Sequence, residues 1–219
     1  MAKNDGQTLV VGLGRFGRAI AVTLGTLGQE VLGIDASARI VQSCAPDLTH
    51  VVQADATDVE ALRQIGAKDF PNAVVAIGSD IQASILTTYA LVDLEIPRIW
   101  AKAITSQHGA ILERVGAHRV IFPERDMGVR MAHSMVGRTI DYLELDENFV
   151  LVETTAPREA VGKTLLEAGL RKRYNVTVVC VKRPGGHFTY ATQETVINAG
   201  DLLVVASDPA HAEAFAALD

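Results

Sequence analysis

The sequence predicts an α/β protein whose larger part is a doubly wound parallel sheet and whose smaller part is an α+β lobe. A glycine-rich turn joins an apolar strand to a helix near the N-terminus, and strand-like and helix-like segments then alternate up to about residue 122. From about residue 148 this rhythm changes, which predicts the second lobe.

The chain is organised around the stretch from Thr8 to Ile20, which reads TLVVGLGRFGRAI. Its apolar run enters Gly12, and Gly14 and Gly17 follow with the spacing G-x-G-x-x-G. In such a motif the first glycine makes the turn, the second lets the backbone approach a diphosphate, and the third lets the helix pack closely. Glycines also mark ordinary loops, but the strand–turn–helix context favours a Rossmann nucleotide site with phosphates at the helix N-terminus.

A second strand, Glu30 to Ile34, ends at Asp35. This position is close to the offset of ~20 residues at which a carboxylate takes the ribose hydroxyls in Rossmann sites. A carboxylate there would accept two hydrogen bonds from an unmodified ribose and would repel a 2′-phosphate.

Six short apolar segments are predicted as strands and the segments between them as helices, which gives a six-stranded parallel sheet covered on both faces. The predicted strands are Leu9–Leu13, Val31–Ile34, His50–Gln53, Ala73–Ile77, Arg98–Ala101 and Arg119–Phe122. The predicted helices are Phe16–Leu27, Ser37–Cys44, Asp58–Ile65, Ile81–Leu94 and Ser106–Val115, with Ser37 and Asp58 as N-caps.

Polar residues follow several of these strands at the carboxyl edge, where ligands bind in such sheets. Asp55 could accept a hydrogen bond from an adenine amino group, or it could form an Asx turn before the next helix. Gly78 permits a close backbone approach in the same layer. Lys102 and His108 follow the fifth strand, where either residue alone is more often solvated than a ligand.

Pro123 stops the sixth strand, and Glu124–Val136 is predicted to form a helix. Met127, Met131 and Met135 recur every four residues and form one apolar stripe on that helix. The stripe packs either on the chain's own sheet or in a subunit interface.

The second lobe begins with a strand at Phe149–Thr154 and a helix at Gly162–Arg173. A hairpin is predicted next, from two strands around a Pro-Gly-Gly turn. The hairpin strands are Val176–Lys182 and Phe188–Tyr190, and they are followed by a strand at Leu202–Ala206 and a helix at Asp208–Leu218.

Composition excludes several classes of protein. The chain has 219 residues, with 20 Lys and Arg against 26 Asp and Glu, and its net charge of −6 argues against nucleic-acid binding. Cys44 and Cys180 are expected to be thiols of a reducing cytoplasm rather than a disulfide. The polar N-terminus does not resemble a signal peptide, and the apolar runs are of strand length, so no membrane insertion is expected.

None of the six histidines falls in a recognisable acid–base motif, and H-E-x-x-H, C-x-x-C and G-x-S-x-G are absent. The second lobe is also too small for a substrate domain. The residues therefore predict a sensor rather than an enzyme, with an NAD(H)-dependent oxidoreductase or redox sensor as the alternative. A transcriptional repressor is a third hypothesis, although no basic helix-turn-helix segment is visible.

Several stretches resemble the cytoplasmic regulatory subunits of Ktr-type bacterial potassium transporters, which are built from an RCK domain with TrkA-N and TrkA-C parts. The shared stretches are GLGRFG at 12–17, DAT at 55–57, IQASILTT at 81–88, IWAKA at 99–103, PERDMG at 123–128 and NAGDLLV at 198–204. The resemblance covers nearly the whole chain, and its single RCK copy favours the Ktr type over Trk-type subunits.

The resemblance implies a nucleotide-binding N-lobe at 1–122, a crossover helix and linker at 123–145, and a C-lobe at 146–219. It implies a homo-octameric ring that regulates a membrane potassium channel subunit from the cytoplasmic face of the membrane. ATP, ADP and, less decisively, NAD(H) are the implied ligands, and the methionine stripe matches the crossover helix between subunits.

The implied binding residues cluster after the strands. They are Arg15, Asp35, Ser37, Asp55, Ala56, Ile77, Gly78, Ser79, Lys102, Ala103, Ile104, His108 and Glu124. Their neighbours Gly12, Gly14, Phe16, Gly17, Ala36 and Thr57 complete the candidate site.

Two further roles are expected. Arg15 could reach the γ-phosphate bound by a neighbouring subunit, and Glu124 could hold Mg²⁺, Ca²⁺ or Na⁺ against that phosphate or simply cap its helix. Related C-lobes bind cyclic di-AMP, and Arg171 matches a position that contacts its phosphates.

Overall fold

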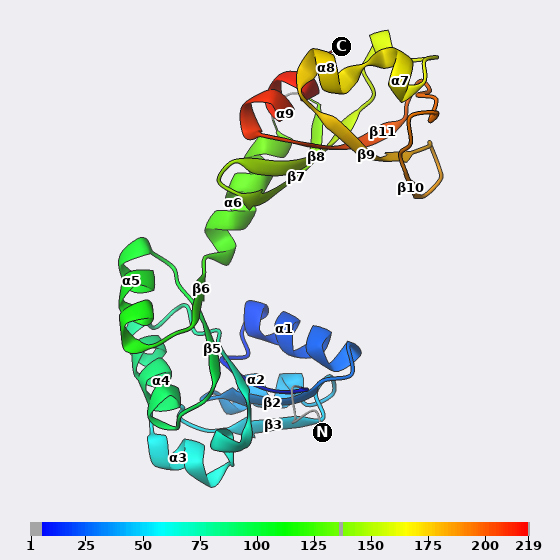
Figure 1. The fold of residues 1–219 in the computed structure, drawn as a ribbon. Helices are drawn as coiled ribbons and strands as arrows, with labels where there is room; N and C mark the ends of the chain where they lie inside the picture. The colour runs from blue at the N-terminus through cyan, green and yellow to red at the C-terminus, as the bar shows by residue number, and fades with distance from the viewer. Residues whose placement is uncertain (1–5, 136–137, 219) are drawn as a thin grey trace. The chain divides into compact units, whose positions relative to one another are not determined.

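The computed structural model describes residues 6–135 and 138–218. The chain divides into two units, Met1–Glu124 and Arg125–Asp219, which are described separately (Figure 1). The predicted polar N-terminal segment lies outside the described residues as far as residue 5, and so does Val136, the predicted end of the sixth helix.

The described part of the first unit contains a six-stranded parallel sheet with the order β3-β2-β1-β4-β5-β6, which confirms the predicted fold class. The order reverses between β1 and β4, and this switch point creates a crevice at the carboxyl edge. The strands are β1 Gln7–Val11, β2 Glu30–Asp35, β3 His50–Gln53, β4 Asn72–Val75, β5 Arg98–Lys102 and β6 Arg119–Ile121.

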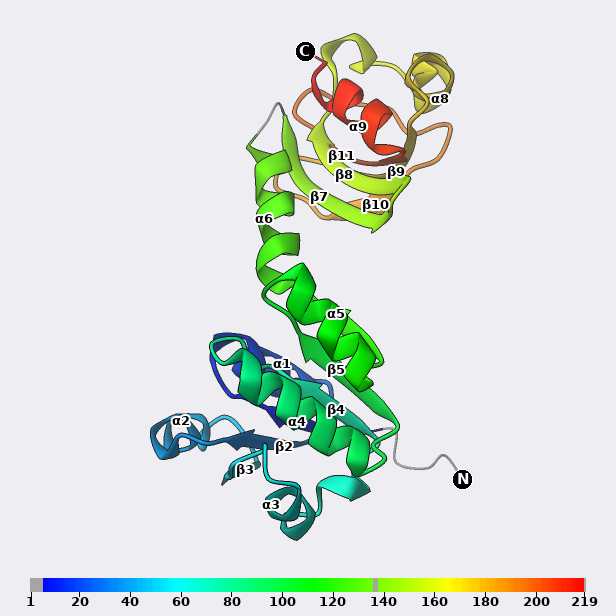
Figure 2. The ribbon, with the colours of Figure 1, turned by 90° about the vertical axis from the view of Figure 1, so that its left-hand side faces the viewer.

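Helices cover both faces of this sheet. One apolar cluster joins α1 and α2 to the sheet, and a larger cluster joins α3, the short 3₁₀ helix η1, α4 and α5 to the opposite face. Figure 2 shows α4 and α5 side by side. The bounds are α1 Arg15–Thr26, α2 Ala38–Cys44, α3 Val59–Gln64, η1 Ala67–Asp69, α4 Ile81–Asp93 and α5 Ser106–Val115.

Short polar side chains begin three of these helices. Asp58, Asp80 and Thr105 each accept a hydrogen bond from a backbone N–H in the first turn of α3, α4 or α5. Ser37 occupies the N-cap position of α2, as predicted, but its side chain makes no capping hydrogen bond. Asp35 instead accepts the bond from the Ser37 N–H.

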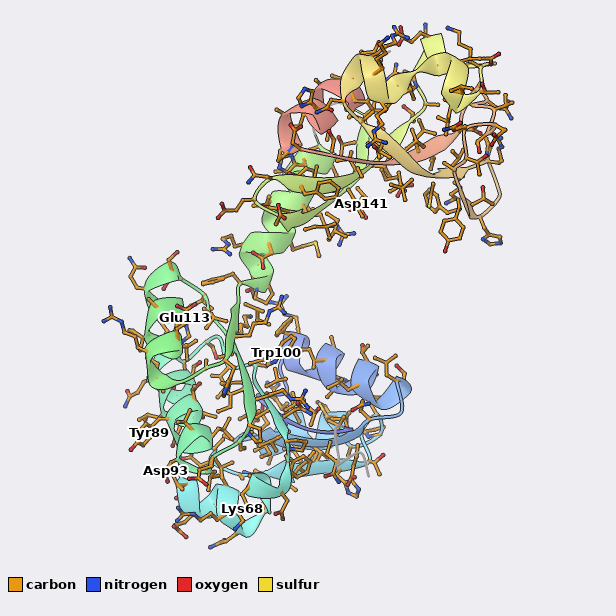
Figure 3. The ribbon with its side chains drawn as sticks, in the orientation of Figure 1. Lys68, Tyr89, Asp93, Trp100, Glu113 and Asp141 are labelled. Carbon is orange, nitrogen blue, oxygen red and sulfur yellow. The ribbon has the colours of Figure 1, made fainter. Side chains whose placement is uncertain are left out.

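Helix α6 spans Pro123–Ser134 and has no buried residue. The predicted methionine stripe is exposed, with Met127 51% and Met131 59% accessible. In the second unit Arg130 pairs with Asp141, and His133 stacks on Tyr142 with 3.8 Å between ring centroids (Asp141 is labelled in Figure 3). Arg130 and His133 therefore tie α6 to Asp141 and Tyr142 of the second unit, while the methionines are exposed.

The described part of the second unit contains a five-stranded antiparallel sheet with the order β10-β9-β11-β8-β7. An apolar core lies between this sheet and the helices. The elements are β7 Thr139–Asp146, β8 Phe149–Thr155, η2 Arg158–Ala160, α7 Leu165–Ala168, α8 Leu170–Tyr174, β9 Thr177–Lys182, β10 Phe188–Tyr190, β11 Leu202–Ser207 and α9 Pro209–Ala216.

Two features of this unit differ from expectation. No strand was predicted between the helix at Glu124–Val136 and the strand at Phe149–Thr154, yet β7 pairs with β8 along its length. Its register shifts near Asp141 and again near Asp146, and these irregularities obscure the alternating pattern of a strand. The predicted helix at 162–173 is wrong, because Gly169 adopts φ +58° and separates α7 from α8.

An ion pair between the half-exposed Arg183 and the buried Asp201 fastens the loop before β11. Asp201 is fully buried, and its Oδ2 accepts hydrogen bonds from Arg183 Nη1 and from the Asn198 N–H, the latter at 2.7 Å. Arg183 Nη2 donates to the Val196 carbonyl at 2.8 Å. This arrangement ties the β9–β10 turn to the 196–201 loop.

Replacement of Asp201 by Ala should therefore destabilise the second unit. The change leaves the Asn198 N–H and the Arg183 guanidinium without their acceptor, so we expect the unfolding free energy to fall by about 2–3 kcal/mol. Urea-dependent hydrogen exchange of the β8 and β11 amides in the full chain measures this quantity. Glu60→Gln, which breaks the exposed pair with Arg63, is the control and should cost under about 1 kcal/mol. Equal losses in the two variants would contradict the structural role of Asp201.

Candidate nucleotide site

The glycine loop has the shape that its sequence predicts. Gly12 adopts φ +88°, and a Cβ there would lie 3.1 Å from the Ile77 backbone nitrogen. A Cβ on Gly17 would lie 1.8 Å from the Gly12 carbonyl oxygen, so only glycine fits there. Gly14 has open space around it and caps α1 without a side-chain bond. The N-terminus of α1 can therefore offer backbone N–H groups to an anion.

Asp35 holds this loop from the neighbouring strand. Its Oδ2 accepts a hydrogen bond from the Leu13 N–H at 2.8 Å, and its Oδ1 accepts one from the Ser37 N–H at 2.9 Å. Each carboxylate oxygen has two acceptor positions, so ribose hydroxyls can still bind. The carboxylate thus has a structural role that the sequence did not predict.

A pocket of about 710 Å³ opens at the ends of β2, β3 and β4. Three predicted residues line it: Ala36, Asp55 and Thr57. Its other lining residues are Gln53, Ala54, Asp80, Gln82, Ala83 and Leu86. Gln53, Asp80 and Gln82 were not predicted as site residues, although they lie beside predicted ones at the strand ends.

Asp55 forms an Asx turn, which was one of the two roles predicted for it from the sequence. Its Oδ1 accepts hydrogen bonds from the Thr57 N–H at 3.0 Å and from Thr57 Oγ1 at 2.7 Å, and these bonds lower the pKa of Asp55 below its usual value. Because the carboxylate is exposed and lines the pocket, the turn fixes it in a position where it can also accept a ligand donor.

A charged cluster lies at the end of β5. Lys102 is only 8% exposed, and its Nζ lies 2.5 Å from Glu124 Oε1 and 5.5 Å from the Phe16 ring centroid. The pKa of Glu124 is lowered chiefly by its hydrogen bond with Lys102, with smaller contributions that include the charge of Arg15. Lys102, predicted as a binding residue although a lone lysine is more often solvated, is therefore a buried cation at the end of β5, near the first turn of α1.

His108 is buried rather than exposed to a ligand. It is 1% accessible, its Nδ1 accepts a hydrogen bond from the Ile104 N–H at 3.4 Å, and burial lowers its pKa. Ala56 and Ala103 are buried as well, whereas Ser79 and Ile104 are exposed. Of these five predicted residues, only Ser79 and Ile104 therefore present an exposed side chain.

Two other residues, Glu124 and Arg171, were expected to hold a cation and a second ligand, respectively. Within residues 6–135 and 138–218, no three His, Cys, Asp or Glu side chains gather as a metal site. Arg171 is exposed in α8 of the second unit. Across the same residues no helix combines the length and apolar character that a bilayer crossing needs.

Comparison with known protein families gives two matches. Residues 8–123 match the TrkA-N domain, and residues 149–218 match the TrkA-C domain. The first match contains the glycine loop, Asp35 and the pocket, and the second covers most of the antiparallel lobe.

Solved structures share the fold. The crystal structure of the GsuK RCK domain superimposes with a TM-score of 0.69 at 19% identity, covering all of this chain and 48% of that one. The GsuK channel bound to NAD gives 0.67 at 20% identity, covering 98% of this chain and 39% of that one. GsuK bound to ADP gives 0.51 at 26% identity, covering 61% of this chain and 34% of that one.

Two relatives from Bacillus subtilis strain 168 match most of the chain. Ktr system potassium uptake protein A is 38% identical over 200 residues, which cover 91% of this chain and 90% of the relative. Ktr system potassium uptake protein C is 39% identical over 197 residues, which cover 90% and 89% respectively. Since the motifs, the two domains and these matches agree over nearly the whole length, the chain belongs to the family of Ktr system potassium uptake proteins with TrkA-N and TrkA-C domains.

Proposed function

We propose that this chain is a nucleotide-sensing subunit that gates a potassium uptake channel, and that it is a regulator rather than an enzyme. The observation that carries the proposal is the glycine loop held by Asp35 beside the pocket at the switch point of the sheet. This is the place where doubly wound sheets bind nucleotides. Membership in the Ktr family supports the coupling to potassium uptake.

The parts of the site suit an adenine nucleotide. The N-terminus of α1 would hold the phosphates, Asp35 would accept the ribose hydroxyls, and Asp55 would accept from the adenine amino group. GsuK has been solved bound to NAD and bound to ADP, which supports both ligand types for this fold. We propose ATP and ADP as the effectors, with NAD(H) as a weaker alternative.

Exposed apolar side chains support an assembly of several copies. The stripe on α6 carries Met127, Met131 and Met135, and we propose that it joins two copies into a dimer. A separate set lies on α4 and α5, where dimers would associate into an octameric ring: Ile81, Leu86, Tyr89 and Ile111 are each at least 40% exposed. This ring would regulate a Ktr-type channel subunit from the cytoplasmic side.

Titration of ATP, ADP, NAD⁺ and NADH by calorimetry tests the ligand class. The adenine nucleotides should bind, and NADP(H) should bind more weakly than NAD(H) because Asp35 repels a 2′-phosphate. Asp35→Ala should weaken all four ligands by roughly tenfold or more, since charge-assisted bonds to the ribose are lost.

Asp35 also holds the glycine loop, so a control must separate the two roles. Asp35→Asn keeps a carbonyl acceptor for the loop. Its thermal stability should therefore be closer to that of the wild type than the stability of Asp35→Ala is. Tight NADH binding with negligible adenine-nucleotide affinity would favour an oxidoreductase or redox sensor. Equal wild-type affinity for NADP(H) and NAD(H) would refute the role of Asp35.

A second prediction concerns how ATP could be told from ADP. We propose that Arg15 donates to the γ-phosphate bound by a neighbouring copy and that Glu124 helps to hold Mg²⁺, Ca²⁺ or Na⁺ against it. Divalent cation should then tighten ATP binding and leave ADP binding nearly unchanged. Glu124→Gln should abolish this cation dependence, and Arg15→Ala should weaken ATP more than ADP. Equal losses for both nucleotides would leave Arg15 as a loop residue and Glu124 as a helix cap.

A third prediction concerns the second lobe. We propose that cyclic di-AMP binds where two copies of this lobe meet, with Arg171 contacting its phosphates. Binding to the full chain at micromolar concentration should be measurable by calorimetry and weakened by Arg171→Ala. Lys172→Ala, which removes a neighbouring charge from α8, is the matched control. The proposal fails if the wild-type chain does not bind, or if the two variants lose affinity equally.

A further inference from the structure

The Lys102–Glu124 pair joins a buried cation to an exposed anion. The Lys102 side chain is 10% accessible, whereas that of Glu124 is 68% accessible. The ammonium packs on the segment between β4 and α4, because a Cβ on Gly78 would lie 3.1 Å from Lys102 Nζ. Lys102 is therefore fixed in place, while the exposed side chain of Glu124 has room to turn into water.

The ammonium also lies beside the phosphate end of the glycine loop. Phe16, whose ring is 5.5 Å from Lys102 Nζ, is the second residue of α1, and the backbone N–H groups of that turn are the proposed phosphate donors. A lysine ammonium attracts phosphate and carboxylate alike, as a compact charge with three donors. A diphosphate at the loop would thus compete with Glu124 for the same cation.

We propose that Glu124 is an internal competitor of the nucleotide phosphate, so that binding exchanges a carboxylate for a phosphate on Lys102. This inference rests on the proposed nucleotide site and adds a regulatory step to it. A buried ammonium is costly without a counter-ion, and the exchange keeps one beside Lys102 throughout. The exposed carboxylate then becomes solvated and is free for other contacts.

The exchange would couple ligand binding to α6 because of the position of Glu124 in the chain. Glu124 is the second residue of α6, and α6 continues into the second unit. Loss of the bond to Lys102 removes a constraint on the first turn of this helix. The released carboxylate is also the group proposed above to meet a cation, so the exchange would precede cation binding.

The affinity for ADP in the presence of a chelator tests the exchange, since ADP has no γ-phosphate and the chelator removes divalent cations. Glu124→Gln removes the competing charge and should tighten ADP binding by about twofold to fivefold. Glu113→Gln removes one exposed carboxylate from α5 (Figure 3) and should leave the affinity unchanged. An unchanged or weaker affinity in Glu124→Gln would overturn the exchange.

The Lys102→Gln background separates the exchange from simple repulsion between Glu124 and the phosphates. In that background, Glu124→Gln should increase the affinity for ADP clearly less than it does in the wild type, because the cation for which the two anions compete is gone. An equal gain in both backgrounds would show general repulsion and overturn the proposal. Absence of ADP binding to the wild type and to every variant would refute the nucleotide site itself, so the two failures are distinguishable.

Hydrogen exchange at the start of α6 gives a second measurement. Saturating ADP should speed exchange of the amides of residues 125–127 in the wild type. In Glu124→Gln these amides should exchange faster before ADP is added and change little afterwards. If ADP leaves the wild-type amides unchanged or protects them, the release of α6 is refuted.

Discussion

The close approach of α1 to the turn after β1 is the constraint on which the nucleotide site depends. Gly17 lies so near the Gly12 carbonyl that any side chain would collide with it. This approach sets the N-terminus of α1 at the carboxyl edge of the sheet, and Asp35 fixes the loop through the Leu13 N–H. Strand order supplies the remaining condition, because the switch point between β1 and β4 opens the crevice there.

Charged side chains lie at two places along the carboxyl edge of the parallel sheet, and one of them is an ion pair that a ligand could disturb. Asp55 lies on the pocket side, where hydrogen bonds from Thr57 lower its pKa. Lys102 and Glu124 lie at the phosphate side and already neutralise each other. In the proposed exchange, a bound phosphate displaces Glu124 from Lys102, so part of the binding free energy would be coupled to a change at the start of α6. An isolated Rossmann site would bind a nucleotide without such a consequence.

The larger sheet was predicted well from the sequence, because the glycine spacing and the alternation of strands and helices depend on residues that are close together in the chain. Strand β7 was missed because its register shifts hide the alternation, and α7 was merged with α8 because Gly169 has no apparent effect on the apolar pattern. Asp35 was predicted as a ligand residue, but its bond to the Leu13 N–H joins positions 22 residues apart in sequence. The Lys102–Glu124 pair likewise depends on which strands and helix ends lie together in space, and no sequence spacing reports that.

Potassium flux through the assembled transporter tests the central claim most directly. The measurement uses vesicles that contain a Ktr-type channel subunit reconstituted with this chain, and it compares flux at saturating ATP with flux at saturating ADP. Vesicles that contain the channel subunit alone provide the control. If the chain is a nucleotide-sensing gate, the two nucleotides should give different fluxes with the chain and equal fluxes without it. Equal fluxes in both preparations, despite measured nucleotide binding, would contradict the account.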